Sequence, residues 1–79
     1  MAIRDAILEQ MAEVAAQQGQ HLATLRDDRP LLDTGLDSLS IAILVANLED
    51  QTGLDPFARD VAFPVTVGDF VRLYEHAEH

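Results

Sequence analysis

The sequence predicts an all-α domain: a small four-helix bundle with a long first loop and a short third helix. Apolar residues recur at helical spacing in three long segments, which begin near positions 3, 38 and 66. No segment alternates apolar and polar residues for long enough to predict a strand. A chain of 79 residues has the size of one domain, which we place at residues 1–79.

The first helix is predicted over residues 3–18. Its apolar side chains recur at intervals of three or four residues and share one face of the helix: Ile3, Ile7, Met11 and Val14. Gly19 is a suitable end, because glycine readily takes the left-handed conformation that often follows a helix.

The first loop is predicted over residues 20–36, where Pro30 and Gly35 interrupt regular structure. A connection of this length is unusual in a compact domain. Its five leucines make it too apolar for a free linker: Leu22, Leu25, Leu31, Leu32 and Leu36. We therefore expect the loop to lie against the helices and to cover the core.

The second helix is predicted over residues 38–51, with Asp37 as its N-cap and Gly53 at its end. This helix is apolar almost all round, and one helix of a small domain cannot easily bury every side. We predict two stripes. The core stripe is Ile41, Leu44, Val45 and Leu48. A second stripe, which faces solvent or a partner, is Leu39, Ile43 and Ala46.

The short third helix is predicted to start at Pro56 and to end near Val61, before Pro64. The last helix opens at Thr66, and its Thr-x-x-Asp pattern with Asp69 resembles a capping box. Val67, Phe70 and Tyr74 share its apolar face, with Val71 beside them.

The composition limits the possible partners and chemistry. Fourteen acidic residues against five arginines, with no lysine, give a net charge of −9, which argues against binding nucleic acid or anionic membranes. The absence of cysteine excludes disulfides and thiolate metal sites. The sequence shows no signal peptide and no apolar run of about 18 residues, the length of a membrane span. We expect a cytoplasmic monomer that does not bind a membrane.

No catalytic or metal site is predicted. Ser38 lies in Gly-Leu-Asp-Ser-Leu, which lacks the second glycine of a nucleophile elbow, and it has no nearby base. A calcium-loop pattern starting at Asp33 fails, because Leu44 stands where a ligating glutamate belongs. The histidines are interpreted as solvated surface residues: His21, His76 and His79. If Ser38 has a chemical role, another enzyme must modify it.

The run from Gly35 to Asp50 points to such a modification. It places Ser38 at a helix start, where backbone N–H groups and the macrodipole favour a negative group. With its acidity, amphipathic first helix, long loop, Asp-Ser-Leu at position 37, Leu-Glu-Asp at 48 and Thr-Val at 66, the chain resembles the acyl and peptidyl carrier proteins. The resemblance covers nearly the whole chain.

The resemblance implies that Ser38 receives 4′-phosphopantetheine from coenzyme A through a magnesium-dependent phosphopantetheinyl transferase. Asp37 would assist that transfer by helping to bind the metal. It also implies that the chain is not an enzyme. It would hold acyl or aminoacyl intermediates as thioesters and act as the tethered substrate of an acyl- or aminoacyl-loading ligase and of synthase or transferase enzymes.

The chain departs from fatty-acid-synthesis carriers, which typically have acidic residues after Asp-Ser-Leu and in the third helix. Here these stretches read Ser-Ile-Ala-Ile at 40–43 and Phe-Ala-Arg-Asp at 57–60. We therefore expect hydrophobic partner docking through Leu39, Ile43 and Ala46, and a role in specialised biosynthesis: polyketide, nonribosomal or modified fatty acid. Two alternatives remain open, a housekeeping fatty-acid carrier and an unmodified helical adaptor.

Overall fold

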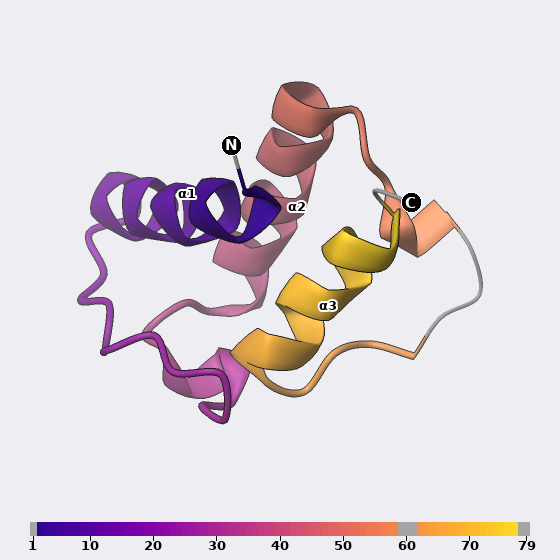
Figure 1. Cartoon of the computed structure of the whole chain (residues 1–79). Helices are drawn as coiled ribbons and strands as arrows, with labels where there is room; N and C mark the ends of the chain where they lie inside the picture. Colours follow the sequence, from indigo (N-terminus) through magenta and orange to yellow (C-terminus); the bar gives the residue numbers. More distant parts are fainter. Residues whose placement is uncertain (1, 59–61, 78–79) are drawn as a thin grey trace.

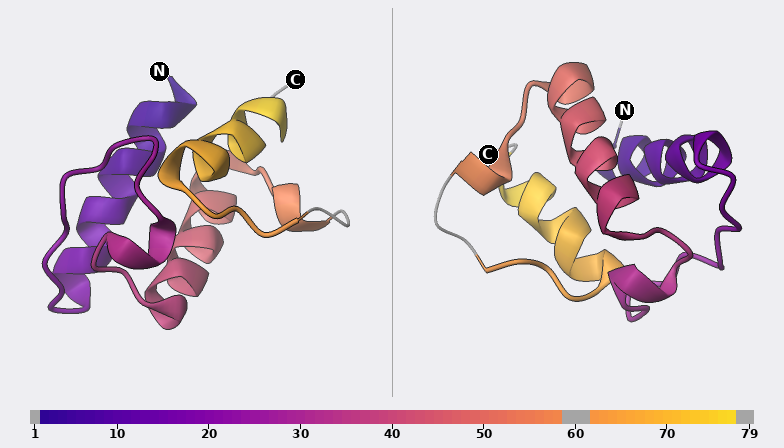
Figure 2. Two further views of the ribbon diagram at one scale, coloured as in Figure 1. Left: turned by 90° about the horizontal axis from the view of Figure 1, so that it is seen from below. Right: turned by 180° about the vertical axis from the view of Figure 1, so that it is seen from behind.

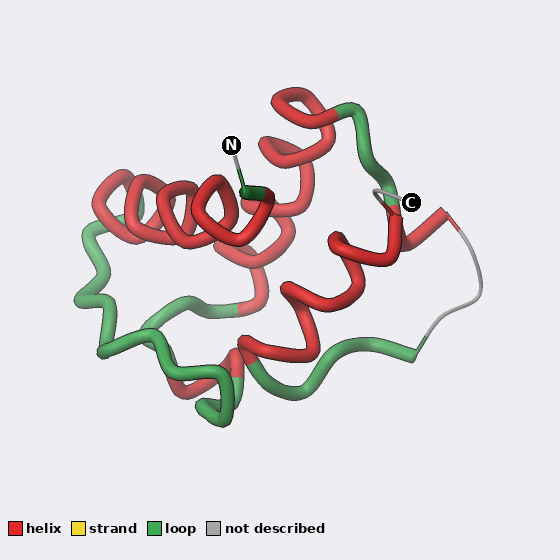
Figure 3. The backbone as a smooth tube through the Cα atoms, in the orientation of Figure 1, coloured by secondary structure: helices red, strands yellow, loops and turns green. Residues whose placement is uncertain are grey.

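The computed structural model describes residues 2–58 and 62–77, and over these ranges the regular structure is helical, apart from an isolated antiparallel bridge between Pro30 and Thr66. Figure 3 shows the helices and the loops that join them. The elements are, in order, α1 (Ile3–Gln17), the 3₁₀ turn η1 (Leu31–Asp33), α2 (Ser38–Thr52), the 3₁₀ turn η2 (Pro56–Ala58) and α3 (Val67–Ala77). The predicted all-α class is confirmed.

The three helices enclose one core. Helix α1 packs against both α2 and α3, and the view from behind in Figure 2 shows α2 lying between the other two. The core side chains come from all three helices and from the first loop: Ile3, Ile7, Met11, Val14, Ala15, Leu31, Leu36, Ile41, Leu44, Leu48, Val67, Phe70, Val71 and Tyr74. The predicted apolar faces of the first and last helices are confirmed.

Helix α2 divides its apolar surface as predicted, with two differences. Ile41, Leu44 and Leu48 are buried, but Val45 of the core stripe is only half-buried. Ile43 of the second stripe is also half-buried and packs against the core. Ser40, which polarity alone would place at the surface, has no exposed area. It lies within the first turn of α2, on the side that faces the loop after α1, and its hydroxyl is hydrogen-bonded there.

The first loop covers the core, as predicted. Leu31 and Leu36 are buried, and Leu22 and Leu25 pack against the core while partly exposed. Leu32 is the exception, because 67% of it is exposed. It follows Leu31 in the tight turn η1, where neighbouring side chains point in different directions, so burying one exposes the other.

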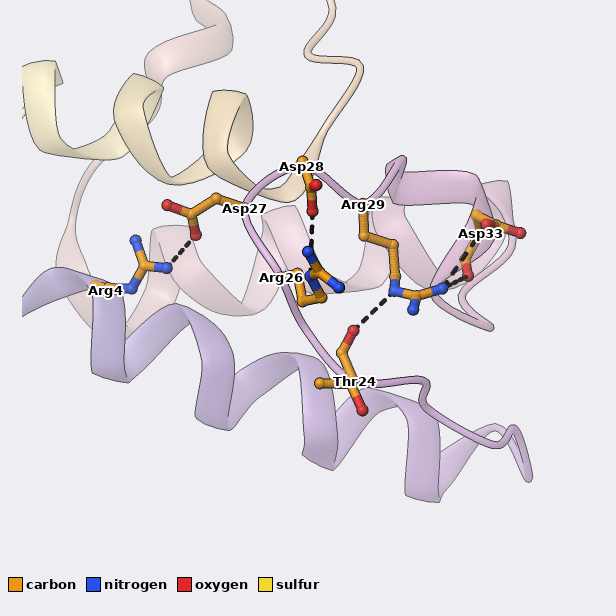
Figure 4. A network of polar contacts seen from close by, with 7 residues as sticks. All are labelled: Arg4, Thr24, Arg26, Asp27, Asp28, Arg29 and Asp33. Atoms are coloured by element: carbon orange, nitrogen blue, oxygen red, sulfur yellow. Dashed lines mark hydrogen bonds and ion pairs between the residues drawn. The ribbon is translucent and has the colours of Figure 1, made fainter.

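Polar contacts hold this loop in place. Figure 4 shows Arg4 of α1 paired with Asp27, Arg26 with Asp28, and Arg29 bonded to the carbonyl oxygen of Thr24 and close to Asp33. The guanidinium group of Arg4 also lowers the pKa of the Asp27 carboxyl. Of these contacts, the Arg4–Asp27 pair joins the loop to α1, and the others lie within the loop.

The same loop completes the start of α3. The backbone N–H groups of Val67 and Gly68 donate to the carbonyl oxygens of Arg29 and Asp27, both at 2.9 Å. These are donors that a helix start leaves without an intrahelical partner. The predicted capping box is also present: the Asp69 N–H donates to the Thr66 hydroxyl at 3.1 Å, and the Thr66 N–H donates to the Asp69 carboxylate at 3.4 Å.

The four-helix count is not confirmed. In place of the expected third helix, the described residues form the single turn η2, and Val61, where that helix was expected to end, lies outside them. Figure 1 shows η2 near the end of α3, and the two elements are in contact. Phe57 packs its ring against Phe63, Phe70 and Tyr74, which ties η2 to α3.

Among the described residues, no helix has the length and apolar character needed to cross a membrane.

Candidate functional site

The start of α2 is capped by a side chain. Asp37 has extended backbone geometry, and its Oδ1 accepts a hydrogen bond from the N–H of Ser40 at 2.8 Å, which confirms the predicted N-cap. This backbone bond is the main cause that lowers the pKa of the Asp37 carboxyl, and the side chains of Ser40 and Gln20 also lower it. The carboxylate is therefore held in its ionised form.

Ser38 is the first residue of α2 and is exposed to solvent, between the exposed Asp37 and Leu39. The N–H groups of Ser38 and Leu39 belong to the first turn, whose donors have no intrahelical acceptor. Together with the macrodipole they favour a negative group at this place, by about 0.3–1 kcal/mol when exposed. A hydroxyl here is both accessible and suited to carry a phosphate ester.

A glycine fixes the turn that leads into the site. Gly35 has φ of 101°, which side chains rarely allow, and a Cβ atom built on it would lie 2.1 Å from the carbonyl oxygen of His21. The nearby N–H of Ala23 donates to the carbonyl oxygen of Thr34 at 2.8 Å. Two distant parts of the first loop thus meet immediately before the site, and only glycine fits between them.

Ser38 opens onto an apolar pocket of about 440 Å³. This volume lies in the range of about 300–1,000 Å³ that is typical of small-molecule sites. The pocket is formed by α2, η1, η2 and the segment before α3: Leu32, Ser38, Ile41, Ala42, Val45, Phe57 and Phe63. Apart from Ser38, every lining residue is apolar, so the pocket suits an uncharged, apolar group.

The expected docking residues differ in exposure. Leu39 is 64% exposed and Ala46 is exposed, but Ile43 is half-buried and packs against the core. Between Leu39 and Ile43, Ile41 is buried as predicted for the core stripe, and Ser40 is buried as well. The helical period turns these two positions toward the core and the loop, respectively.

The sequence did not reveal three residues that shape the site. Leu32 and Phe63 line the pocket from outside α2, and the side chain of Gln20 accepts a hydrogen bond from the Ser40 hydroxyl at 2.8 Å. The apolar character of Leu32 and Phe63 was visible, but their meeting depends on long-range folding. No local pattern indicated the contact of Gln20, which lies 20 positions before Ser40.

Within the ranges 2–58 and 62–77, no group of three or more histidine or acidic side chains could hold a metal ion. His21 and His76 are exposed, and His79 lies outside those ranges.

Comparisons with known proteins agree with this geometry. Residues 5–74 match the family model described as the phosphopantetheine attachment site. The fold is similar to the solution structure of MacpD, an acyl carrier protein from Pseudomonas fluorescens involved in mupirocin biosynthesis. The TM-score is 0.78 at 40% sequence identity, covering 91% of this chain and 67% of that one. No curated protein matches the sequence.

The chain belongs to the phosphopantetheine attachment family, because the family model spans nearly all of it. It is a helical carrier protein that bears a covalent 4′-phosphopantetheine group. The group supplies a terminal thiol, which this cysteine-free chain lacks, and on which acyl or aminoacyl cargo is held as a thioester. An exposed hydroxyl at a capped helix start, beside an apolar pocket, fits such a group.

Proposed function

We propose that Ser38 is the attachment residue and that Asp37 assists the transfer. The observation that carries the proposal is the position of Ser38: it is exposed, it begins α2, and it borders the apolar pocket. Asp37 precedes it with an ionised carboxylate at the same helix start. In this arrangement one residue offers the hydroxyl and its neighbour offers an anion that can help to bind a transferase's metal.

The chain contains two serines, Ser38 and Ser40. Because Ser38 is exposed and Ser40 is buried, their alanine variants form a test and its matched control. Incubation with coenzyme A, magnesium and a broad-specificity phosphopantetheinyl transferase should raise the mass by roughly 340 Da. Ser38→Ala should abolish the gain. Ser40→Ala, which changes a fully buried serine, should still reach it at the end of the reaction. An unchanged wild-type mass, beside a control carrier that is modified, would overturn the proposal and favour an unmodified adaptor.

We also propose that the modified chain is the tethered substrate of a loading ligase and of synthase or transferase enzymes, in specialised biosynthesis. Its 40% identity to a carrier involved in mupirocin biosynthesis supports this role. So does the start of α2, whose first turn contains no acidic residue. A housekeeping carrier would replace the fatty-acid carrier in a reconstituted fatty-acid synthesis reaction, and we expect that this chain does not.

Leu39, Ile43 and Ala46 are the proposed docking residues, which we name the docking strip. Leu39 and Ala46 are accessible at its two ends, with the half-buried Ile43 between them. Recognition through this strip is more hydrophobic and less electrostatic than through an acidic helix. Because Ile43 also packs against the core, a charge at this position would destabilise the domain, so Ala46 is the better position for a test.

A further inference from the structure

The end of α1 is connected to the start of α2 through Gln20. Gly19, with φ of 67°, turns the chain after α1. The backbone N–H of Gln20 then donates to the carbonyl oxygen of Ala15 at 2.8 Å. The main chain of Gln20 is thereby fixed against the last turn of α1, and its half-buried side chain reaches toward α2.

Ser40 links Gln20 to Asp37. Its hydroxyl donates to Oε1 of Gln20, and its backbone N–H donates to Oδ1 of Asp37, each at 2.8 Å. Ser40 has no exposed area, so its hydroxyl would lose its partner without Gln20, and a buried, unpaired hydroxyl is costly. The first turn of α2 is thus held from within by Asp37 and from outside by Gln20.

We propose that Gln20 is a positioning residue for the modification of Ser38. By fixing Ser40, it sets the orientation of the Asp37 carboxylate beside the Ser38 hydroxyl. The inference rests on the proposed function, in which Ser38 is modified with the help of Asp37. A helix start frays readily when only local contacts hold it, and a contact from another helix restricts that motion.

The reaction shows why orientation matters. The Ser38 oxygen forms a bond to the phosphorus of the pantetheine phosphate of coenzyme A. The pyrophosphate P–O bond breaks, adenosine 3′,5′-bisphosphate leaves, and the serine proton passes to a base of the transferase. Misplacing the carboxylate next to the attacking oxygen lowers the rate of this step, because reacting groups must be held in the right geometry. The contact with the docking strip is not affected.

The test compares Gln20→Ala with the matched control Gln17→Ala, which changes an exposed glutamine at the end of α1. With the apo chain as substrate, Gln20→Ala should lower the kcat of the transferase reaction about three- to tenfold, the loss expected for one hydrogen bond. The KM for the chain should stay unchanged, as should both constants of the control. A loss of global folding alone would not produce this division between kcat and KM.

Two further measurements keep the inference falsifiable. The transferase should modify Ser40→Ala and the double variant Gln20→Ala/Ser40→Ala at the same reduced rate, because the two substitutions remove the same hydrogen bond. In NMR spectra of the apo chain, the Ser40 amide should exchange faster in Gln20→Ala, while amides in α3 do not change. If Gln20→Ala fails to fold, Gln20→Asn, one methylene shorter, tests the same contact.

The outcomes separate the two proposals. An unmodified wild-type chain refutes the proposed function. If the wild-type chain is modified and Gln20→Ala is modified with the same kcat, only the positioning role is refuted. Additive effects of Gln20→Ala and Ser40→Ala also refute it, because they would show that the two residues act independently.

Discussion

The two ends of α2 are built differently. At the start, Asp37 caps the helix, Gln20 holds Ser40 from outside, and Gly35 fits tightly against His21. Within residues 2–58 and 62–77, the side-chain hydrogen bonds at the end are local ones through Thr52, to Leu48 and Leu54. Gly53 closes it with φ of 73°, its N–H donates to the carbonyl oxygen of Glu49, and a Cβ atom on it would meet nothing within 4 Å.

The charges of the two ends also differ. Glu49 and Asp50 lie in the last turn, with no basic residue in that turn, where the macrodipole disfavours anions. The first turn of α2 contains no acidic residue. We infer that tertiary contacts fix the end that begins with Ser38, the proposed attachment residue, while the exposed far end tolerates an unfavourable charge.

Two glycine substitutions should separate the ends most clearly. Gly35→Ala combines a left-handed backbone with a clash against His21, and should lower the free energy of unfolding by about 2–5 kcal/mol. Gly53→Ala meets open space and should cost only about 1–2 kcal/mol. Urea denaturation of both variants measures the difference, and equal losses would contradict the tight fit before the site.

A charge on the docking strip should weaken the binding of the transferase to α2. Ala46→Glu should raise the transferase's KM for the chain about tenfold, because a buried, unpaired charge weakens an interface. The control is Ala12→Glu, the same change at an exposed position of α1, and it should leave KM unchanged. Both variants should melt at similar temperatures. Equal KM values for the two variants would show that the strip does not contact the transferase.

The capping carboxylate of Asp37 makes the stability of the fold depend on pH. The folded structure lowers the pKa of Asp37 below its ordinary value of 3.8, so its charge stabilises the fold above that pH, and the contribution is lost as the pH falls through the folded pKa. Asp37→Asn keeps a capping side chain without the charge. The stability difference between wild type and variant should be largest near neutral pH and shrink below pH 3.8. A difference independent of pH would contradict this role.

Removing a charge at the far end of α2 should have the smallest effect, and it should raise the free energy of unfolding instead of lowering it. Asp50→Asn should stabilise the domain by about 0.3–1 kcal/mol at low ionic strength, since it removes an anion from a helix end. Asp5→Asn, in the first turn of α1, should destabilise it by a similar amount. Both effects should shrink with added salt. Two changes of the same sign would refute the macrodipole explanation.

The predictions from the sequence succeed where a property depends on local pattern. The cap at Asp37, the glycine after α2 and the Thr66–Asp69 capping box each involve residues within a few positions of each other. Periodicity alone also placed the buried faces of α1 and α3 correctly. The predictions fail where packing overrides the pattern. Val45, predicted for the core stripe, is only half-buried, and the described residues form only the turn η2 where the third helix was expected.

The candidate site also has features that the local sequence predicts and features that depend on packing. The motif around Ser38 identifies the exposed hydroxyl at a helix start, because that geometry follows from a few neighbouring residues. The half-buried state of Ile43 could not be decided in this way, since it depends on what lies beside α2.

Three features of this protein follow from the order of its residues alone: an all-helical domain, a serine at a capped helix start, and an apolar second helix with more than one face. Two others depend on how the chain packs: Leu32 and Phe63 complete a pocket beside that serine, and Gln20 holds the helix start. Caps and periodic faces form between near neighbours, whereas the pocket and the Gln20–Ser40 bond join segments that meet only when the core is packed.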